Sequence, residues 1–103
     1  MDRRIETKVV ETEQAALTTI INKDPSEVWW ITVSPTTMGT VGVVKIYDGF
    51  DAGGKLRWII EAGYSRLYPF IPPIPCDQGI TVYSDTNVAS YTIGYRPFDW
   101  PRG

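Results

Sequence analysis

Residues 41–62 decide the fold class, and they read VGVVKIYDGFDAGGKLRWIIEA. Two runs rich in β-branched and aromatic residues, 41–47 and 56–61, flank the loop DGFDAGGK at 48–55. Such residues suit a pleated, half-buried surface, and apolar and charged side chains alternate in the second run. The loop glycines permit positive φ angles, which favours a bulged or longer hairpin turn over a two-residue turn. The stretch therefore predicts a hairpin in an antiparallel β protein.

Six further segments resemble strands, and turn residues separate them about every 10 to 12 residues. With the hairpin, the predicted strands are 5–12, 15–22, 28–34, 41–47, 56–61, 67–71, 78–84 and 88–97. A helix over 11–21 is an alternative that the β-branched run 18–21 disfavours. Prolines inside and after 67–71 place that strand at a sheet edge or at a crossing between sheets.

The pattern predicts one domain, residues 1–103, with a possible extended tail at 97–103. We expect an all-β, eight-stranded antiparallel β-sandwich of the jelly-roll kind. A closed barrel or a Greek-key sandwich has the same kind of strand pattern, but the cysteine and tryptophan spacing of a true immunoglobulin domain is missing.

Alternation within three strands predicts which side chains lie together on one face. The sets expected to share a face are Ile5, Thr7 and Val9; Trp29, Ile31 and Val33; Val28, Trp30 and Thr32; and Ala89, Tyr91, Ile93 and Tyr95. Glu6 and Lys8 are expected on the solvent-exposed face of the first strand. Ala89, Tyr91, Ile93 and Tyr95 are expected on the inner face of the last strand.

Charge and composition exclude several classes of partner. The chain has a formal net charge of −2, so it lacks the basic surface that duplex DNA or an anionic membrane would attract. Hydrophobic residues make up 43% of the chain, which is too apolar for intrinsic disorder. Neither a signal peptide nor a membrane-spanning run is recognisable. We therefore expect a folded, soluble protein that binds neither nucleic acid nor membranes.

The residues of most catalytic sites are missing. The sequence has no histidine, which removes the commonest general base, the usual serine and cysteine triads and most zinc sites. Cys76 is the single cysteine, so no intrachain disulfide can form, and Asp77 beside it would raise its pKa. We expect Cys76 to be a small, semi-buried hydrophobic residue.

The carboxylates and glycines of the turns have structural explanations. Asp48 and Asp51 resemble part of a calcium loop, but the final glutamate of an EF-hand is absent. Gly49, Gly53 and Gly54 lead into a strand, whereas a phosphate-binding loop leads into a helix. The sequence therefore predicts no catalytic residues, no metal ligands and no cofactor.

Aromatic residues mark the candidate partner interface. Trp30 is expected on the face of its strand opposite Trp29, and Phe98 and Trp100 lie in the proline-bounded tail. Tryptophan is a frequent interface anchor. The tail residues could equally fold back and cap the sandwich.

Several segments together resemble the small β-sandwich virion proteins of tailed bacteriophages. The resemblance covers 28–97 and consists of IYDG with GGK, then FIPPI, QGITV and YTIGY. It implies a structural protein such as a head decoration or cement protein, or a neck or tail component. Such a protein is made in the host cytoplasm, is located in the virion, and binds copies of itself and other virion proteins. A carbohydrate-binding or receptor-binding module is the alternative, because sandwiches with exposed aromatic residues stack on sugar rings.

Overall fold

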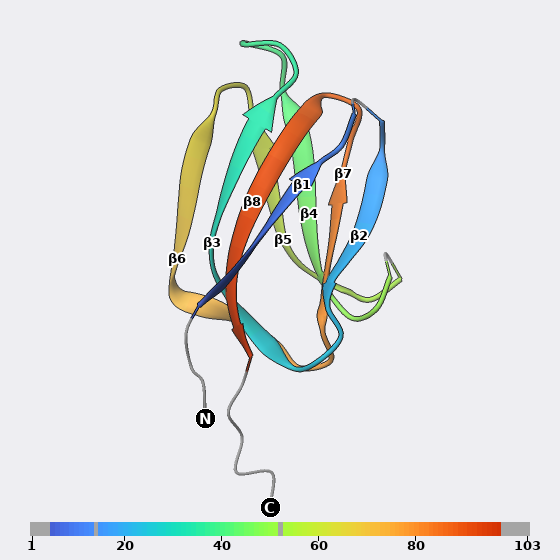
Figure 1. The fold of residues 1–103 in the computed structure, drawn as a ribbon, viewed down its shortest axis with the longest axis vertical. Helices are drawn as coiled ribbons and strands as arrows, with labels where there is room; N and C mark the ends of the chain where they lie inside the picture. The colour runs from blue at the N-terminus through green and yellow to red at the C-terminus, as the bar shows by residue number, and fades with distance from the viewer. Residues whose placement is uncertain (1–4, 14, 52, 98–103) are drawn as a thin grey trace, which may run out of the picture.

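A computed structural model describes residues 5–13, 15–51 and 53–97, and over these it shows eight β-strands (Figure 1). The strands are β1 (Glu6–Glu11), β2 (Leu17–Asn22), β3 (Ser26–Pro35), β4 (Gly42–Asp48), β5 (Lys55–Ala62), β6 (Arg66–Cys76), β7 (Ile80–Ser84) and β8 (Val88–Pro97). All eight predicted strands are present, and β2 replaces the alternative helix over 11–21.

The strands form two four-stranded antiparallel sheets, which pack against each other. The first sheet has the order β1-β8-β3-β6 and faces the viewer in Figure 1, and the second has the order β2-β7-β4-β5. The first strand pairs with the last, the second with the seventh, the third with the sixth and the fourth with the fifth. This is a long hairpin rolled into a sandwich, which is jelly-roll connectivity. The predicted fold class is confirmed.

The core lies between the sheets and is filled by side chains from both. Ile31 occupies a central position, with Ile93 of β8 and Tyr68 of β6 directly beside it in the first sheet. The buried apolar residues are Val10, Ile21, Val28, Ile31, Val33, Val44, Ile46, Ile60, Ala62, Phe70, Ile74, Cys76, Ile80, Val82, Val88, Tyr91 and Ile93.

A β-bulge in β3 overturns one predicted face. Val28 lies opposite Tyr95 and Trp30 lies opposite Gly94, so Trp29 is an extra residue in the ladder. One extra residue reverses the alternation beyond it. Val28 is therefore buried on the same side as Ile31 and Val33, and Trp29 is not. Each of the two sets predicted for this strand is wrong at its first residue, whereas Ile31 with Val33, and Trp30 with Thr32, share a face as predicted.

Strand β1 also faces the opposite way from the prediction. Val10 is buried, whereas Val9 is 65% exposed and Ile5 is 42% exposed. β1 is the edge of its sheet, and both of its faces are largely exposed except at Val10. At such an edge, charged side chains at inward positions stay in contact with water. The positions of Glu6 and Lys8 therefore do not indicate which face of β1 is the outer one.

In β8, two of the four residues predicted to face inward are fully buried. Tyr91 and Ile93 are in the core, and Tyr95 packs half-buried against it. Ala89 is skipped where the pairing moves from Ser34–Ser90 to Pro35–Val88, so Val88 is buried in its place.

Strand β6 is the edge that its prolines predicted, but it is longer than the predicted 67–71. It continues through Pro72, Pro73 and Pro75 to Cys76 and pairs only with β3. An edge strand has a partner on one side only, so it tolerates residues that lack an N–H group.

Candidate functional site

The middle of the solvent-facing side of the first sheet carries no charged side chain. We call it the outer face and define it by two cross-strand rows: Thr7, Gly94, Trp30 and Pro69, and beside them Val9, Thr92, Thr32 and Leu67. Ile71, two residues beyond Pro69 on β6, makes this surface larger. Val9 is 65%, Leu67 55% and Ile71 90% exposed, and neither row contains a charged residue. Contiguous exposed apolar surface of this kind marks interaction sites.

A groove of about 540 Å³ runs over the β3–β6 side of the outer face. Its lining is almost entirely apolar and comes from Trp29, Trp30, Thr32, Leu67, Pro69, Phe70 and Ile71. Trp30, the predicted interface residue, therefore lies on a surface that a partner can reach. The two other predicted interface residues, Phe98 and Trp100, lie outside the described residues.

Gly94 determines where the Trp30 indole lies. The two residues are directly opposite each other in the β3–β8 ladder. A Cβ atom built on Gly94 would lie only 2.7 Å from Cζ2 of Trp30, and closer still to other atoms of the ring. The indole can therefore lie over residue 94 of β8 only because that residue has no side chain.

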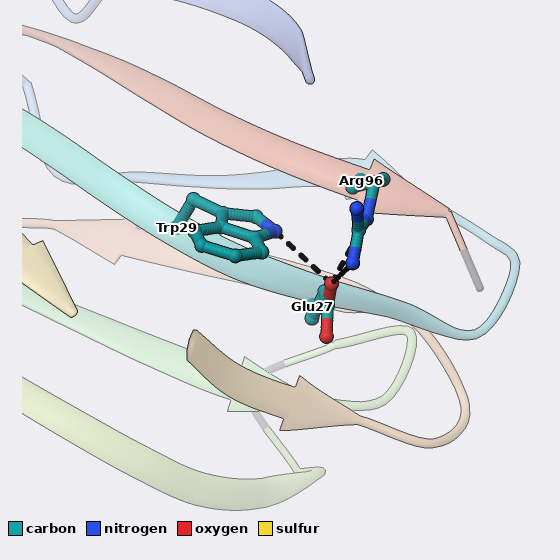
Figure 2. Close-up of polar contacts among 3 residues, drawn as sticks. All are labelled: Glu27, Trp29 and Arg96. Carbon is teal, nitrogen blue, oxygen red and sulfur yellow. Dashed lines mark hydrogen bonds and ion pairs between the residues drawn. The ribbon is translucent and has the colours of Figure 1, made fainter. Parts of the chain in front are cut away.

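Beside the groove, an ion pair fixes Trp29 (Figure 2). The Nε1–H of Trp29 donates a hydrogen bond of 3.0 Å to Oε1 of Glu27, and Arg96 donates to the same oxygen from Nε at 3.0 Å and from Nη2 at 2.6 Å. The Arg96 guanidinium also lies 5.1 Å from the centre of the Trp29 ring. These two charges neutralise each other, so the pair adds no net charge beside the outer face.

Cys76 is a core residue, more deeply buried than the semi-buried position predicted for it, and its environment opposes ionisation. The side chain is fully buried at the end of β6. Burial raises the pKa of the thiol to about 12, with further raising by Asp48 and Asp77 and an opposing effect of Arg57. A thiolate nucleophile is therefore disfavoured at neutral pH.

Stability is expected to fall as the pH rises from about 9 toward 12. The unfolded chain ionises Cys76 near its ordinary pKa of 9.0, whereas the folded chain keeps it protonated up to about 12. Unfolding therefore releases a proton in this window, and the free energy of unfolding decreases with pH. We expect urea unfolding at about pH 8 and about pH 10 to show a smaller decrease for Cys76→Ala than for the wild type. Equal decreases would contradict the assignment.

Three turn carboxylates accept hydrogen bonds from backbone N–H groups. Asp48 accepts hydrogen bonds from the N–H groups of Asp77 and Gln78, at 2.9 and 2.8 Å. Asp51 accepts from the N–H of Gly53, and Asp85 accepts from that of Asn87. Over 5–13, 15–51 and 53–97, no three acidic or cysteine side chains come together as metal ligands.

Asp48→Ala is expected to lower the free energy of unfolding by about 1–3 kcal/mol, because two N–H groups lose a charged acceptor. Asp24→Ala is the matched control. Asp24 is exposed, and its side chain makes no hydrogen bond to any described residue, so we expect a change within about 0.5 kcal/mol. Chemical denaturation of both variants measures the difference, and equal effects would refute the role given to Asp48.

A second groove of about 560 Å³ lies between the edge strands β5 and β6. Arg57, Trp58 and Tyr68 line it together with Phe70 and the proline-rich part of β6. The Trp58 and Phe70 rings are 5.5 Å apart at 68°, an edge-to-face contact. These two rings do not form the flat platform that would favour stacking on a sugar.

The outer face was only partly foreseeable from the sequence. Trp30 was identified, but Leu67 and Ile71, its most exposed apolar neighbours on β6, were not. Leu67 and Ile71 alternate along β6 with the half-buried Tyr68 and the buried Phe70, and this alternation indicates that they face outward.

Comparisons with protein-family models, curated proteins and solved structures found no match for this chain. Within the described residues there is no helical segment with the length and hydropathy of a membrane span.

Proposed function

We propose that the chain is a non-enzymatic structural protein of a bacteriophage virion, a head decoration or cement protein that binds copies of itself and neighbouring virion proteins. The observation that carries the proposal is the uncharged, exposed apolar outer face of the first sheet, with Trp30, Leu67 and Ile71. The sequence resemblance supplies the class of protein, and the jelly-roll sandwich is compatible with it.

The molecule has the features that such a role requires. A decoration protein needs a rigid scaffold and contact surfaces rather than reactive groups. The one cysteine is fully buried with a raised pKa, and the loop carboxylates bind backbone N–H groups. Individual contacts on a symmetric particle can be weak, because many of them act together.

Fractionation of the native source tests the proposal. Particles from a lysate that contains this protein are purified on a density gradient, and their components are identified by mass spectrometry. We expect the chain to cofractionate with particles in many copies. Recovery in the soluble fraction alone would contradict the virion role, and soluble monomer that also binds a glycan array would establish the carbohydrate-binding alternative instead.

A further inference from the structure

The groove between β5 and β6 lies where the sandwich is open. β5 is an edge of the second sheet and β6 is an edge of the first, so none of the strands that the structure describes closes this side. The groove is lined by Trp58, Tyr68 and Phe70, with Pro72 and Pro73 along β6. Trp58 is 48% exposed despite its contact with the buried Phe70. An apolar segment could cover these side chains.

One wall of this groove can form backbone hydrogen bonds. Among the described strands, β5 pairs with β4 only, and it is eight residues long and contains no proline, so the backbone groups on its other side have no ladder partner there. β6 carries four prolines, which protect it from strand addition. An extended segment that enters the groove would therefore add to β5 rather than to β6.

Arg57 gives the groove a positive charge. Its side chain lines the groove and is half-buried, and it makes no ion pair with any described residue. A half-buried guanidinium favours an occupant with a carboxylate. The groove on the outer face differs in this respect, because the cation near it, Arg96, is already paired with Glu27.

The segment after β8 has the matching chemistry. Residues 98–103 lie outside the described structure and read Phe98-Asp99-Trp100-Pro101-Arg102-Gly103. In an extended chain, Phe98 and Trp100 point to one side and Asp99 to the other. Two aromatic rings and one carboxylate complement a groove of aromatic and proline side chains whose arginine has no ion-pair partner in the described part of the chain.

Geometry favours the segment of a second copy over the chain's own. Pro97 lies in one row with Ser26 and Cys76, so two strand spacings, about 10 Å in all, separate it from β6. Asp99 is two residues beyond Pro97 and can extend at most about 7 Å from it. The groove begins on the far side of β6, beyond that reach.

We propose that residues 98–103 of one copy bind in the β5–β6 groove of a second copy, with Asp99 paired to Arg57 and the aromatic residues against Trp58 and the prolines. The inference rests on the proposed function in that copies of the chain assemble. It identifies a contact that does not use the outer face.

A charge-swap experiment on the full-length protein tests this pairing, with association measured by light scattering. Arg57→Glu and Asp99→Arg are each expected to weaken self-association about tenfold, because each places two charges of the same sign opposite each other in the contact. The double variant is expected to regain association. An equimolar mixture of the two single variants is expected to associate more strongly than either alone, since both contacts between one variant and the other are again complementary in charge.

The mixture distinguishes two copies from one. Rescue in the double variant without any rescue in the mixture would mean that the segment binds its own chain, and the proposal would be overturned. Failure of both rescues would overturn the pairing itself. Arg66→Glu, at the start of β6 and outside the groove lining, is the matched control and should leave association unchanged.

The outcome also separates this inference from the proposed function. If the wild type associates, a charge on the outer face abolishes association, and Arg57→Glu has no effect, the groove contact is wrong and the assembly role survives. If the wild type remains monomeric at all concentrations, neither contact between copies exists. Circular dichroism spectra of every variant should match the wild type, and Arg57→Gln replaces Arg57→Glu if that variant misfolds.

Discussion

Ile31→Ala is expected to lower the free energy of unfolding by about 2–5 kcal/mol, the largest effect of any single substitution proposed for this chain. Ile31 is fully buried in β3, the strand that joins β8 and β6 within the first sheet. Alanine would remove three carbon atoms between Ile93 and Tyr68 and leave a cavity, because neighbours on a hydrogen-bonded sheet can relax only partly.

The matched control is Ile59→Ala, which deletes the same atoms from a side chain that is 48% exposed on β5. We expect it to lower the free energy of unfolding by less than about 1 kcal/mol. Guanidinium unfolding of the two variants gives the comparison. Equal losses would show that the space between the sheets is not the core.

Gly94→Ala is expected to lower the free energy of unfolding by about 1–3 kcal/mol, because the new methyl group occupies space held by the Trp30 ring. The indole would have to leave its position over β8, which would also disrupt the groove on the outer face. A shift in tryptophan fluorescence should accompany the loss of stability.

A double-mutant cycle isolates this contact. In a Trp30→Ala background the ring is gone, so adding Gly94→Ala should have little further effect, and the two substitutions should be strongly non-additive. If Gly94→Ala is equally destabilising in both backgrounds, backbone conformation at residue 94 and not the Trp30 contact explains the glycine.

The fold class was predictable because turns and strand composition are local signals. The hairpin around Asp48 and the β-branched content of its flanks depend only on neighbouring residues. The jelly-roll strand order could be anticipated only as a class, since pairings such as β1 with β8 join residues from opposite ends of the chain.

The facing of side chains was less predictable, for two physical reasons. A bulge at Trp29 shifts the alternation of β3 by one residue, and only the partner strand shows it. At the sheet edge, β1 is exposed on both faces except at Val10, so its charges carry no information about which face is inward. Alternation indicates facing reliably in straight, central stretches such as Tyr91 to Ile93.

The candidate contact surface was foreseen at one residue of the described chain. Trp30 stood out by its type, whereas Leu67 and Ile71 are ordinary apolar residues whose exposure depends on β6 being an edge strand beside β3. Gly94 gave no signal in the sequence, because its role is to leave room for a ring from another strand.

The central claim is that the outer face of the first sheet mediates assembly, and the molar mass in solution tests it most directly. Light scattering after size-exclusion chromatography is measured for the wild type, for Leu67→Glu on the outer face, and for Met38→Glu in the β3–β4 loop. Both substituted side chains are exposed, at 55% and 70%, so the two variants differ in the position of the new charge. We predict a wild-type mass of at least twice the 11.6 kDa of one chain, the same mass for Met38→Glu, and a lower mass for Leu67→Glu. A monomeric wild type, or equal masses for the two variants, would contradict the claim.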